Sequence, residues 1–188
     1  MKADVLFIHP GGQRKIYQGL SRGLTAIAPP VWIALLAQAV REKGFAPAVY
    51  DANLEGWGEE TAAALLEQHR PRLAVIMVYG HHPSASTQTM PAAGAIARSL
   101  KESAPDLPVA MGGLHPTVLP ERTLREEAAD YVIAGEGVYT IPALVEYLRG
   151  TRDLSRVPGL WYRSGSAASA TPPAPAAEDL DRLLPDYA

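Results

Sequence analysis

The chain of 188 residues has no cysteine, no long apolar run and no excess of positive charge. Without cysteine it cannot form disulfides, thiolate metal sites or cysteine-ligated iron–sulfur clusters. No apolar run reaches the roughly 18 residues that a membrane span needs, and the opening "MKADVLFIHPGG" is typical of a first strand, not of a cleavable signal. We therefore expect a cytoplasmic protein without a membrane partner. The net charge of −3 provides no basic surface and disfavours nucleic acid as a partner.

Five short apolar runs alternate with longer segments of helical periodicity. The runs are "DVLFIHP", "APAVYDA", "LAVIMVYG", "LPVAMGG" and "DYVIAGEG". Such runs are typical of buried parallel strands. The alternation predicts a doubly wound α/β fold, flavodoxin-like (Rossmann-like), in which five parallel strands lie in the order 2-1-3-4-5.

The predicted helices lie between these strands. The first begins at Pro30 and ends at Lys43, before Gly44. The third begins near Met90, because Pro91 would disrupt a helix interior. The others are expected around residues 58–70, 120–128 and 140–150. The first helix is expected to bury Val31, Trp32, Leu35, Leu36, Ala39 and Val40.

The pattern changes after Gly150. The stretch "VPGLWYRSGS" predicts a sixth strand that turns at Gly165, and residues 167–188 are so rich in alanine and proline that they indicate a linker or docking arm without core residues. We therefore divide the chain into an α/β binding domain, residues 1–150, and a C-terminal hairpin with a linker, residues 151–188.

The loops that follow the strands carry glycine next to polar side chains. In an open parallel sheet, ligands bind beyond the carboxyl ends of the strands, and glycine lets a ligand approach the backbone. The candidate binding residues in these loops are Gly11, Gly12, Asp51, Tyr79, Gly80, His81, His82, Ser84, Ser86, Gly112, Gly113, His115, Pro116, Gly135, Glu136 and Gly137.

Each candidate also has an ordinary structural explanation. The glycine pairs at 112–113 and 135–137 fit tight turns, the histidines fit solvated loops, and Asp51 fits a helix cap or loop anchor. No segment matches the dinucleotide pattern G-x-G-x-x-G after the first strand, nor the phosphate loop G-x-x-x-x-G-K-[ST]. A phospho-receiver would place an aspartate where this chain has Tyr79. A flavodoxin-like nucleotide or flavin binder remains an alternative.

The order of "VLFIHP", "VYDANLEGW", "VAMGGLHPTVLPE" and "DYVIAGEGVYTIPALVEYLRG" resembles the cobalamin-binding domain of cobalamin-dependent radical S-adenosylmethionine enzymes. That family includes the anaerobic porphyrin ring cyclase and many methyltransferases. The resemblance runs from about residue 3 to 188, including "GLWYRSG" and "DLDRLLPDY". It implies a cobalamin-binding module of a methyltransferase or oxidative cyclase.

The family's C-x-x-x-C-x-x-C motif has no counterpart here. The resemblance therefore implies that the [4Fe-4S] cluster and S-adenosylmethionine belong to a radical S-adenosylmethionine domain outside these residues, in cis or in trans. This chain alone is not expected to be catalytic. The alternative is a stand-alone corrinoid carrier or sensor.

The sequence also departs from a known cobalamin-binding pattern at the motif that supplies the lower ligand of cobalt. Methionine-synthase-like domains carry D-x-H-x-x-G after the first strand, whereas "DANLEG" follows the second strand and has Asn53 in place of histidine. The resemblance thus implies base-off cobalamin without a histidine ligand, the alternative being that His81, His82 or His115 moves in as the lower ligand. It further implies that Gly112 and Gly113 leave room for the flat corrin or its nucleotide tail. The tail would thread between the sheet and the loops after strands three and four, where hydroxyl donors are available from Ser84, Ser86 and Thr87.

Overall fold

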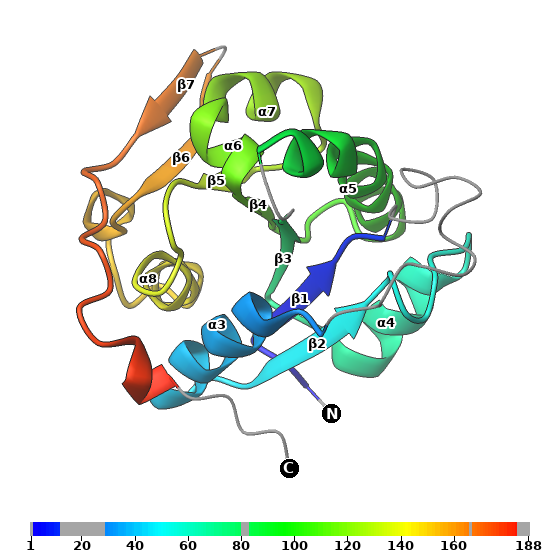
Figure 1. Cartoon of the computed structure of the whole chain (residues 1–188), viewed down its shortest axis with the longest axis horizontal. Helices are drawn as coiled ribbons and strands as arrows, with labels where there is room; N and C mark the ends of the chain where they lie inside the picture. Colours follow the sequence, from blue (N-terminus) through cyan, green and yellow to red (C-terminus); the bar gives the residue numbers. More distant parts are fainter. Residues whose placement is uncertain (1, 12–28, 80–82, 166, 184–188) are drawn as a thin grey trace.

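The computed structural model describes residues 2–11, 29–79, 83–165 and 167–183. They form one seven-stranded sheet in the order β2-β1-β3-β4-β5-β6-β7 (Figure 1). The strands are β1 Val5–His9, β2 Pro47–Asp51, β3 Leu73–Val78, β4 Val109–Gly113, β5 Tyr131–Ile133, β6 Leu160–Ser164 and β7 Ala167–Ala170.

The first five strands are parallel and lie in the predicted order 2-1-3-4-5. The apolar run of β3 is buried along its whole length, since both faces of the central sheet are covered. Strand β2 differs from the expected buried strand. It is the edge of the sheet, and its residue Val49 is 47% exposed.

Helices cover both faces of the sheet (Figure 1). Helices α3 Val31–Glu42 and α8 Thr140–Leu148 pack on one face, and α4 Thr61–His69 and α5 Pro83–Ser103 pack on the other. Successive residues of β1 enter opposite cores because side chains alternate along a strand: Phe7 joins the α3–α8 core, and Leu6 joins the α4–α5 core. Within the described ranges, no helix is long and apolar enough to cross a membrane.

Three details of the helices differ from prediction. Helix α5 begins at Pro83, where a missing N–H costs nothing, and continues through Pro91, whose ring lies on the exposed side. Helix α3 has the predicted start, but Val31 is 49% exposed, and the buried positions include Ile33 and Ala37. The single helix expected around 120–128 is α7, Pro120–Glu126, and it is preceded by an unpredicted short helix, α6, Leu114–Val118.

The C-terminal hairpin is confirmed. Strand β6 pairs antiparallel with β5, β7 pairs antiparallel with β6, and Gly165 adopts a positive φ of 62° in the turn between them. A 3-10 turn, η2 Leu154–Arg156, leads into β6.

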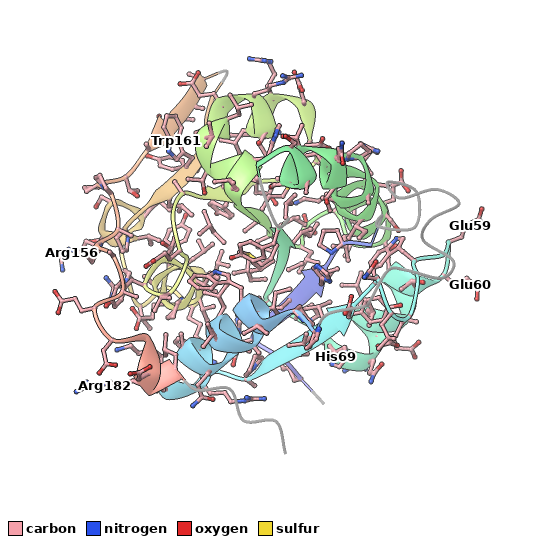
Figure 2. The ribbon with its side chains drawn as sticks, in the orientation of Figure 1. Glu59, Glu60, His69, Arg156, Trp161 and Arg182 are labelled. Atoms are coloured by element: carbon pink, nitrogen blue, oxygen red, sulfur yellow. The ribbon has the colours of Figure 1, made fainter. Side chains whose placement is uncertain are left out.

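The segment after β7 was expected to contain no core residue, and this was wrong. Its 3-10 turn, η3 Leu180–Leu183, lies against α3 (Figure 1), and Leu183 is only 5% exposed. An apolar side chain placed next to a helix face becomes buried even in an alanine- and proline-rich segment. Figure 2 shows Arg182 of the same turn at the outer margin of the molecule.

Candidate functional site

The described candidate residues follow the carboxyl ends of the five parallel strands. Gly11 follows β1, Asp51 ends β2, Tyr79 follows β3, and Gly113 ends β4. Gly112 lies within β4, and the remaining described candidates belong to the first turn of α5, to α6 and to the loop after β5. Gly12, Gly80, His81 and His82 lie outside the described residues.

Ser86 joins two of these loops. Its side chain is fully buried, and its hydroxyl donates to the carbonyl oxygen of Val78, at the end of β3, over 2.8 Å. The hydroxyl oxygen of Ser86 in turn accepts the backbone N–H of His115, at the start of α6, over 3.0 Å. A hydroxyl has one proton to donate, and here that proton is used within the protein. Ser86 therefore holds α5, β3 and α6 together instead of offering its proton to a ligand, as the sequence had suggested.

His115 is fixed by a second contact. Its Nδ1 lies 2.9 Å from the hydroxyl oxygen of Thr87 on α5. Partial burial, and then the positive charge of Arg122, lower the pKa of His115, whereas Glu126 acts in the opposite direction. The imidazole lines a cavity of about 230 Å³ between α5 and α7, whose lining is both apolar and polar.

Gly113 is required by the sheet itself, and Gly112 packs closely against a side chain of the neighbouring strand. A Cβ atom at Gly113, whose φ is +110°, would lie 2.2 Å from the carbonyl oxygen of Val78 on the neighbouring strand. A Cβ atom at Gly112 would lie 2.9 Å from the sulfur of Met77. A close approach between β3 and β4 thus gives a steric reason for glycine at 113 within the protein, and the room for a ligand that the sequence suggested stays a prediction. A bulky side chain at 113 would disturb the fold.

Asp51 anchors the loop after β2. Its Oδ1 lies 2.9 Å from Nδ1 of His9, at the end of β1, and accepts the backbone N–H of Asn53 over 2.9 Å. Both ionisable side chains are nearly buried, at 12% and 13% exposure. Of the two roles considered for Asp51, ligand contact and loop anchor, the geometry supports the anchor.

A cavity of about 380 Å³ opens next to this anchor. It lies between the loops after β1 and β2 and the surface of α5. Its lining combines small residues with one indole ring: Gly11, Ala52, Asn53, Leu54, Glu55, Gly56, Trp57, Ala92, Ala95 and Ile96. This cavity is large enough for a flat aromatic group with a sugar attached, since small-molecule pockets begin at about 300 Å³.

The loop after β5 is held from three sides. The hydroxyl of Thr117 accepts the backbone N–H of Gly135 over 3.2 Å. The indole N–H of Trp32 donates to the carbonyl oxygen of Glu136 over 3.2 Å, and the carboxylate Oε2 of Glu136 accepts the backbone N–H of Ala177 over 2.7 Å.

Tyr79 lies beside this loop. Its ring packs edge-on against Trp32, with centroids 6.1 Å apart. Its hydroxyl is buried and has no hydrogen-bond partner among the residues that the structure describes. Burial raises the pKa of Tyr79 far above its usual value and outweighs the opposite effect of the Trp32 side chain, while the charge of Glu136 raises it further; the hydroxyl therefore stays protonated.

Exposed apolar side chains gather at the same edge of the sheet. Those on the connections that follow β1, β2, β4 and β5 are Val31, Leu54, Leu114, Val118, Leu119 and Tyr139, each between 39% and 67% exposed. We call these six residues the apolar rim. Outside the rim, the described residues include one further exposed large hydrophobic, Val49. These side chains are available for contact with an apolar ligand surface.

Several of these residues were missed by sequence reasoning. His9 was visible at the end of the first strand, but its pairing with Asp51 depends on the β1–β2 register. Trp32 was assigned to the core, although its N–H reaches a carbonyl 104 positions away. No local sequence pattern predicts a contact over such a distance along the chain. In the described ranges, no group of three His, Asp or Glu side chains could hold a metal ion.

The sequence matches the B12 binding domain family over residues 20–145. The chain belongs to this family. Over 89% of its length it is 30% identical to an uncharacterized methyltransferase of Pyrococcus horikoshii, covering 35% of that protein. Over 97% of its length it is 28% identical to the anaerobic magnesium-protoporphyrin IX monomethyl ester cyclase of Rubrivivax gelatinosus, covering 32% of it. The B12-binding chain thus spans about a third of these relatives.

The fold of this B12-binding chain is also found in a solved structure. The radical S-adenosylmethionine methyltransferase TsrM from Kitasatospora setae, with cobalamin and a [4Fe-4S] cluster bound, superposes with a TM-score of 0.70 at 18% identity. The match covers 98% of this chain and 31% of TsrM. The expected α/β architecture of a cobalamin-binding domain is confirmed.

The described residues fit a corrinoid. A corrin ring is broad and flat, with largely apolar faces and amide arms at its periphery. The apolar rim provides apolar contact area at the carboxyl edge of the sheet, and the cavity beside Asn53 can accept the nucleotide tail. This cavity adjoins the loops after β1 and β2; the placement of the tail beside the loops after strands three and four, which the sequence suggested, stays a prediction.

Proposed function

We propose that this chain is the cobalamin-binding module of a radical S-adenosylmethionine enzyme, either a methyltransferase or a ring-forming cyclase. The match to the B12 binding domain family over residues 20–145 carries the proposal, because that range contains most of the loops at the carboxyl edge of the sheet. The relatives named as a methyltransferase and as cyclases support the choice of reaction classes. The module is expected to act in the cytoplasm.

The chain's own part is to bind and orient the cofactor. The corrin would rest on the apolar rim around Leu114 and Tyr139, and the nucleotide tail would enter the cavity lined by Asn53 and Trp57. Bound cobalamin would supply cobalt–carbon chemistry, whose electronic character depends on the lower ligand. Ser86 and Asp51 would act indirectly, since their polar atoms brace the loops.

The chain cannot itself ligate an iron–sulfur cluster through cysteine, because it has none. Radical generation would therefore belong to a separate radical S-adenosylmethionine domain, in cis or in trans. The solved TsrM structure, which holds both cobalamin and a [4Fe-4S] cluster in one protein, supports the arrangement in cis. A stand-alone corrinoid carrier would bind cobalamin equally well but would show no methyl transfer or cyclisation when such a domain is supplied.

We further propose that cobalamin is held base-off without a protein histidine. Each described histidine at the carboxyl edge has a side-chain partner: His9 pairs with Asp51, and His115 with Thr87. His69 lies at the opposite edge, at the end of α4 (Figure 2). Both contacts use Nδ1, and such a contact does not prevent Nε2 of the same ring from binding a metal; the proposal is therefore supported mainly by the absence of a D-x-H-x-x-G motif after β1.

The test is the electron paramagnetic resonance spectrum of the chain loaded with cob(II)alamin. A base-off state without histidine predicts no three-line nitrogen splitting, in the parent chain and in the single variants His81→Ala, His82→Ala and His115→Ala. A splitting that disappears in one variant would identify that histidine as the ligand. A splitting that persists in all three would leave His9 or the cofactor's own benzimidazole as the ligand; a splitting that persists in His9→Ala as well would indicate the benzimidazole and contradict the placement of the tail. Flavin mononucleotide, added as a comparison ligand, should not bind.

A further inference from the structure

The last described segment of the chain, residues 171–183, runs from the hairpin across the loop after β5 to α3 (Figure 1). We call it the C-terminal strap. At its start, the carbonyl oxygen of Pro172 accepts the backbone N–H of Gly159 over 2.7 Å, and the backbone N–H of Thr171 donates to Leu160 over 2.9 Å. At its end, Leu183 is buried in the core between α3 and α8. The strap is thus attached at both ends.

Between these attachments, the strap is tied to a candidate ligand loop by one side chain. Oε2 of Glu136 accepts the backbone N–H of Ala177 over 2.7 Å. The carbonyl oxygen of the same glutamate accepts the indole N–H of Trp32, and the Trp32 ring contacts Tyr79 at the end of β3. Glu136 therefore touches both the strap and the ring pair at the carboxyl edge.

The loop around Glu136 needs such outside support. Its flanking residues, Gly135 and Gly137, have φ values of +102° and +86°, so the backbone on both sides lies in a region that glycine enters freely. Glycine also gives the unfastened loop many alternative conformations, whose loss must be offset when the loop is ordered for a ligand. Because the Glu136 carboxylate is bound to the strap, the loop has fewer conformations to lose when a ligand binds.

We propose that Glu136 is a positioning residue: its carboxylate couples the order of the C-terminal strap to the affinity of the loop after β5 for cobalamin. The inference rests on the proposed function, and it assigns Glu136 a different role from the direct ligand contact that its place in the sequence suggested. By thermodynamic reciprocity, a strap that strengthens cobalamin binding is itself ordered further when cobalamin binds.

Two substitutions separate this role from direct contact. In Glu136→Gln the amide oxygen can still accept the N–H of Ala177, so a positioning role predicts that affinity for hydroxocobalamin stays within about 2-fold of the parent chain. In Glu136→Ala the acceptor is lost, and affinity should fall about 5- to 10-fold. The control is Glu178→Ala, which removes an exposed carboxylate from the same strap and should leave the affinity unchanged.

Hydrogen–deuterium exchange of the strap provides the second measurement. In the parent chain, hydroxocobalamin should slow exchange in residues 171–183; in Glu136→Ala the same residues should exchange faster, and the cofactor should no longer slow them. Equal losses of affinity in the Gln and Ala variants would indicate that the charge contacts the ligand and would overturn the proposal, as would an Ala variant that binds as tightly as the parent. A parent chain that binds no cobalamin would instead contradict the proposed function.

Discussion

The hydroxyl of Ser86 lies between two backbone groups: it donates to the carbonyl oxygen of Val78 over 2.8 Å and accepts the N–H of His115 over 3.0 Å. These bonds cross from α5 to the ends of β3 and β4, the central strands at the candidate site. One small side chain thus fixes the spacing of two loops whose positions are set by distant parts of the sequence.

Replacement of Ser86 by alanine should therefore destabilise the fold. The substitution leaves the Val78 carbonyl and the His115 N–H without this partner in a buried environment, at a cost of about 1–3 kcal/mol. Urea unfolding of the variant measures this cost. Ser84→Ala, in the same turn but exposed, is the control and should change the unfolding free energy by less than about 0.5 kcal/mol. Equal unfolding free energies of the two variants would show that the hydrogen bonds of Ser86 do not stabilise the fold.

A pair of glycine substitutions tests the close approach of β3 and β4. Gly113 and Gly135 have similar φ values, +110° and +102°, but a Cβ at 135 meets no described atom within 4 Å, whereas one at 113 meets the Val78 backbone. Gly135→Ala should cost only conformational strain, about 1–3 kcal/mol. Gly113→Ala should cost at least about 2 kcal/mol more, since the strands must separate. Thermal unfolding of both variants checks this, and equal losses would remove the steric argument.

Tyr79→Phe should leave the cofactor-free chain as stable as the parent or up to about 1 kcal/mol more stable. The variant keeps the ring contact with Trp32 and removes a buried hydroxyl that has no partner in the described part of the chain. Tyr131→Phe is the comparison, because the Tyr131 hydroxyl interacts with Tyr147 and its loss should lower stability. A Tyr79→Phe variant that unfolds at clearly lower urea concentration would indicate a partner for that hydroxyl.

The stability of the fold should fall as the solution becomes mildly acidic, in part through His115. Partial burial and Arg122 lower the pKa of His115, so the folded chain takes up a proton less readily than the unfolded chain. The resulting stabilisation is complete above the unfolded pKa of about 6.5 and is lost as the pH falls through the lower folded value. His115→Gln should flatten the unfolding free energy between about pH 5 and 7.5. His69, whose pKa is also lowered by burial, accounts for a remaining slope. An unchanged slope in His115→Gln would exclude the contribution.

The strand order could be predicted because it rests on local patterns. The apolar run of β3 is fully buried, and Gly44 follows the end of α3 as expected. The start of α5 could not be predicted reliably, since Pro83 and Pro91 both satisfy the rule for a first helical residue, and only packing decides between them.

The sequence predicted where the candidate site lies in the fold, but it did not predict which side chains contact one another there. Topology alone puts the loops at the carboxyl edge of the sheet. Whether Ser86, Glu136 or Asp51 faces a ligand or another loop depends on partners 29, 41 and 42 positions away, and the sequence contains no local trace of these distances. The need for glycine at position 113 could not be predicted either, because it arises from a contact with the neighbouring strand.

Isothermal titration of the purified chain with hydroxocobalamin, and separately with methylcobalamin, tests the central claim most directly. The account predicts saturable binding of about one cobalamin per chain, with a negative heat-capacity change as the apolar rim is covered. Binding should weaken when Leu114 on that rim is replaced by aspartate, although the exposed position leaves the fold intact. A parent chain that is folded and binds neither cobalamin would contradict the account.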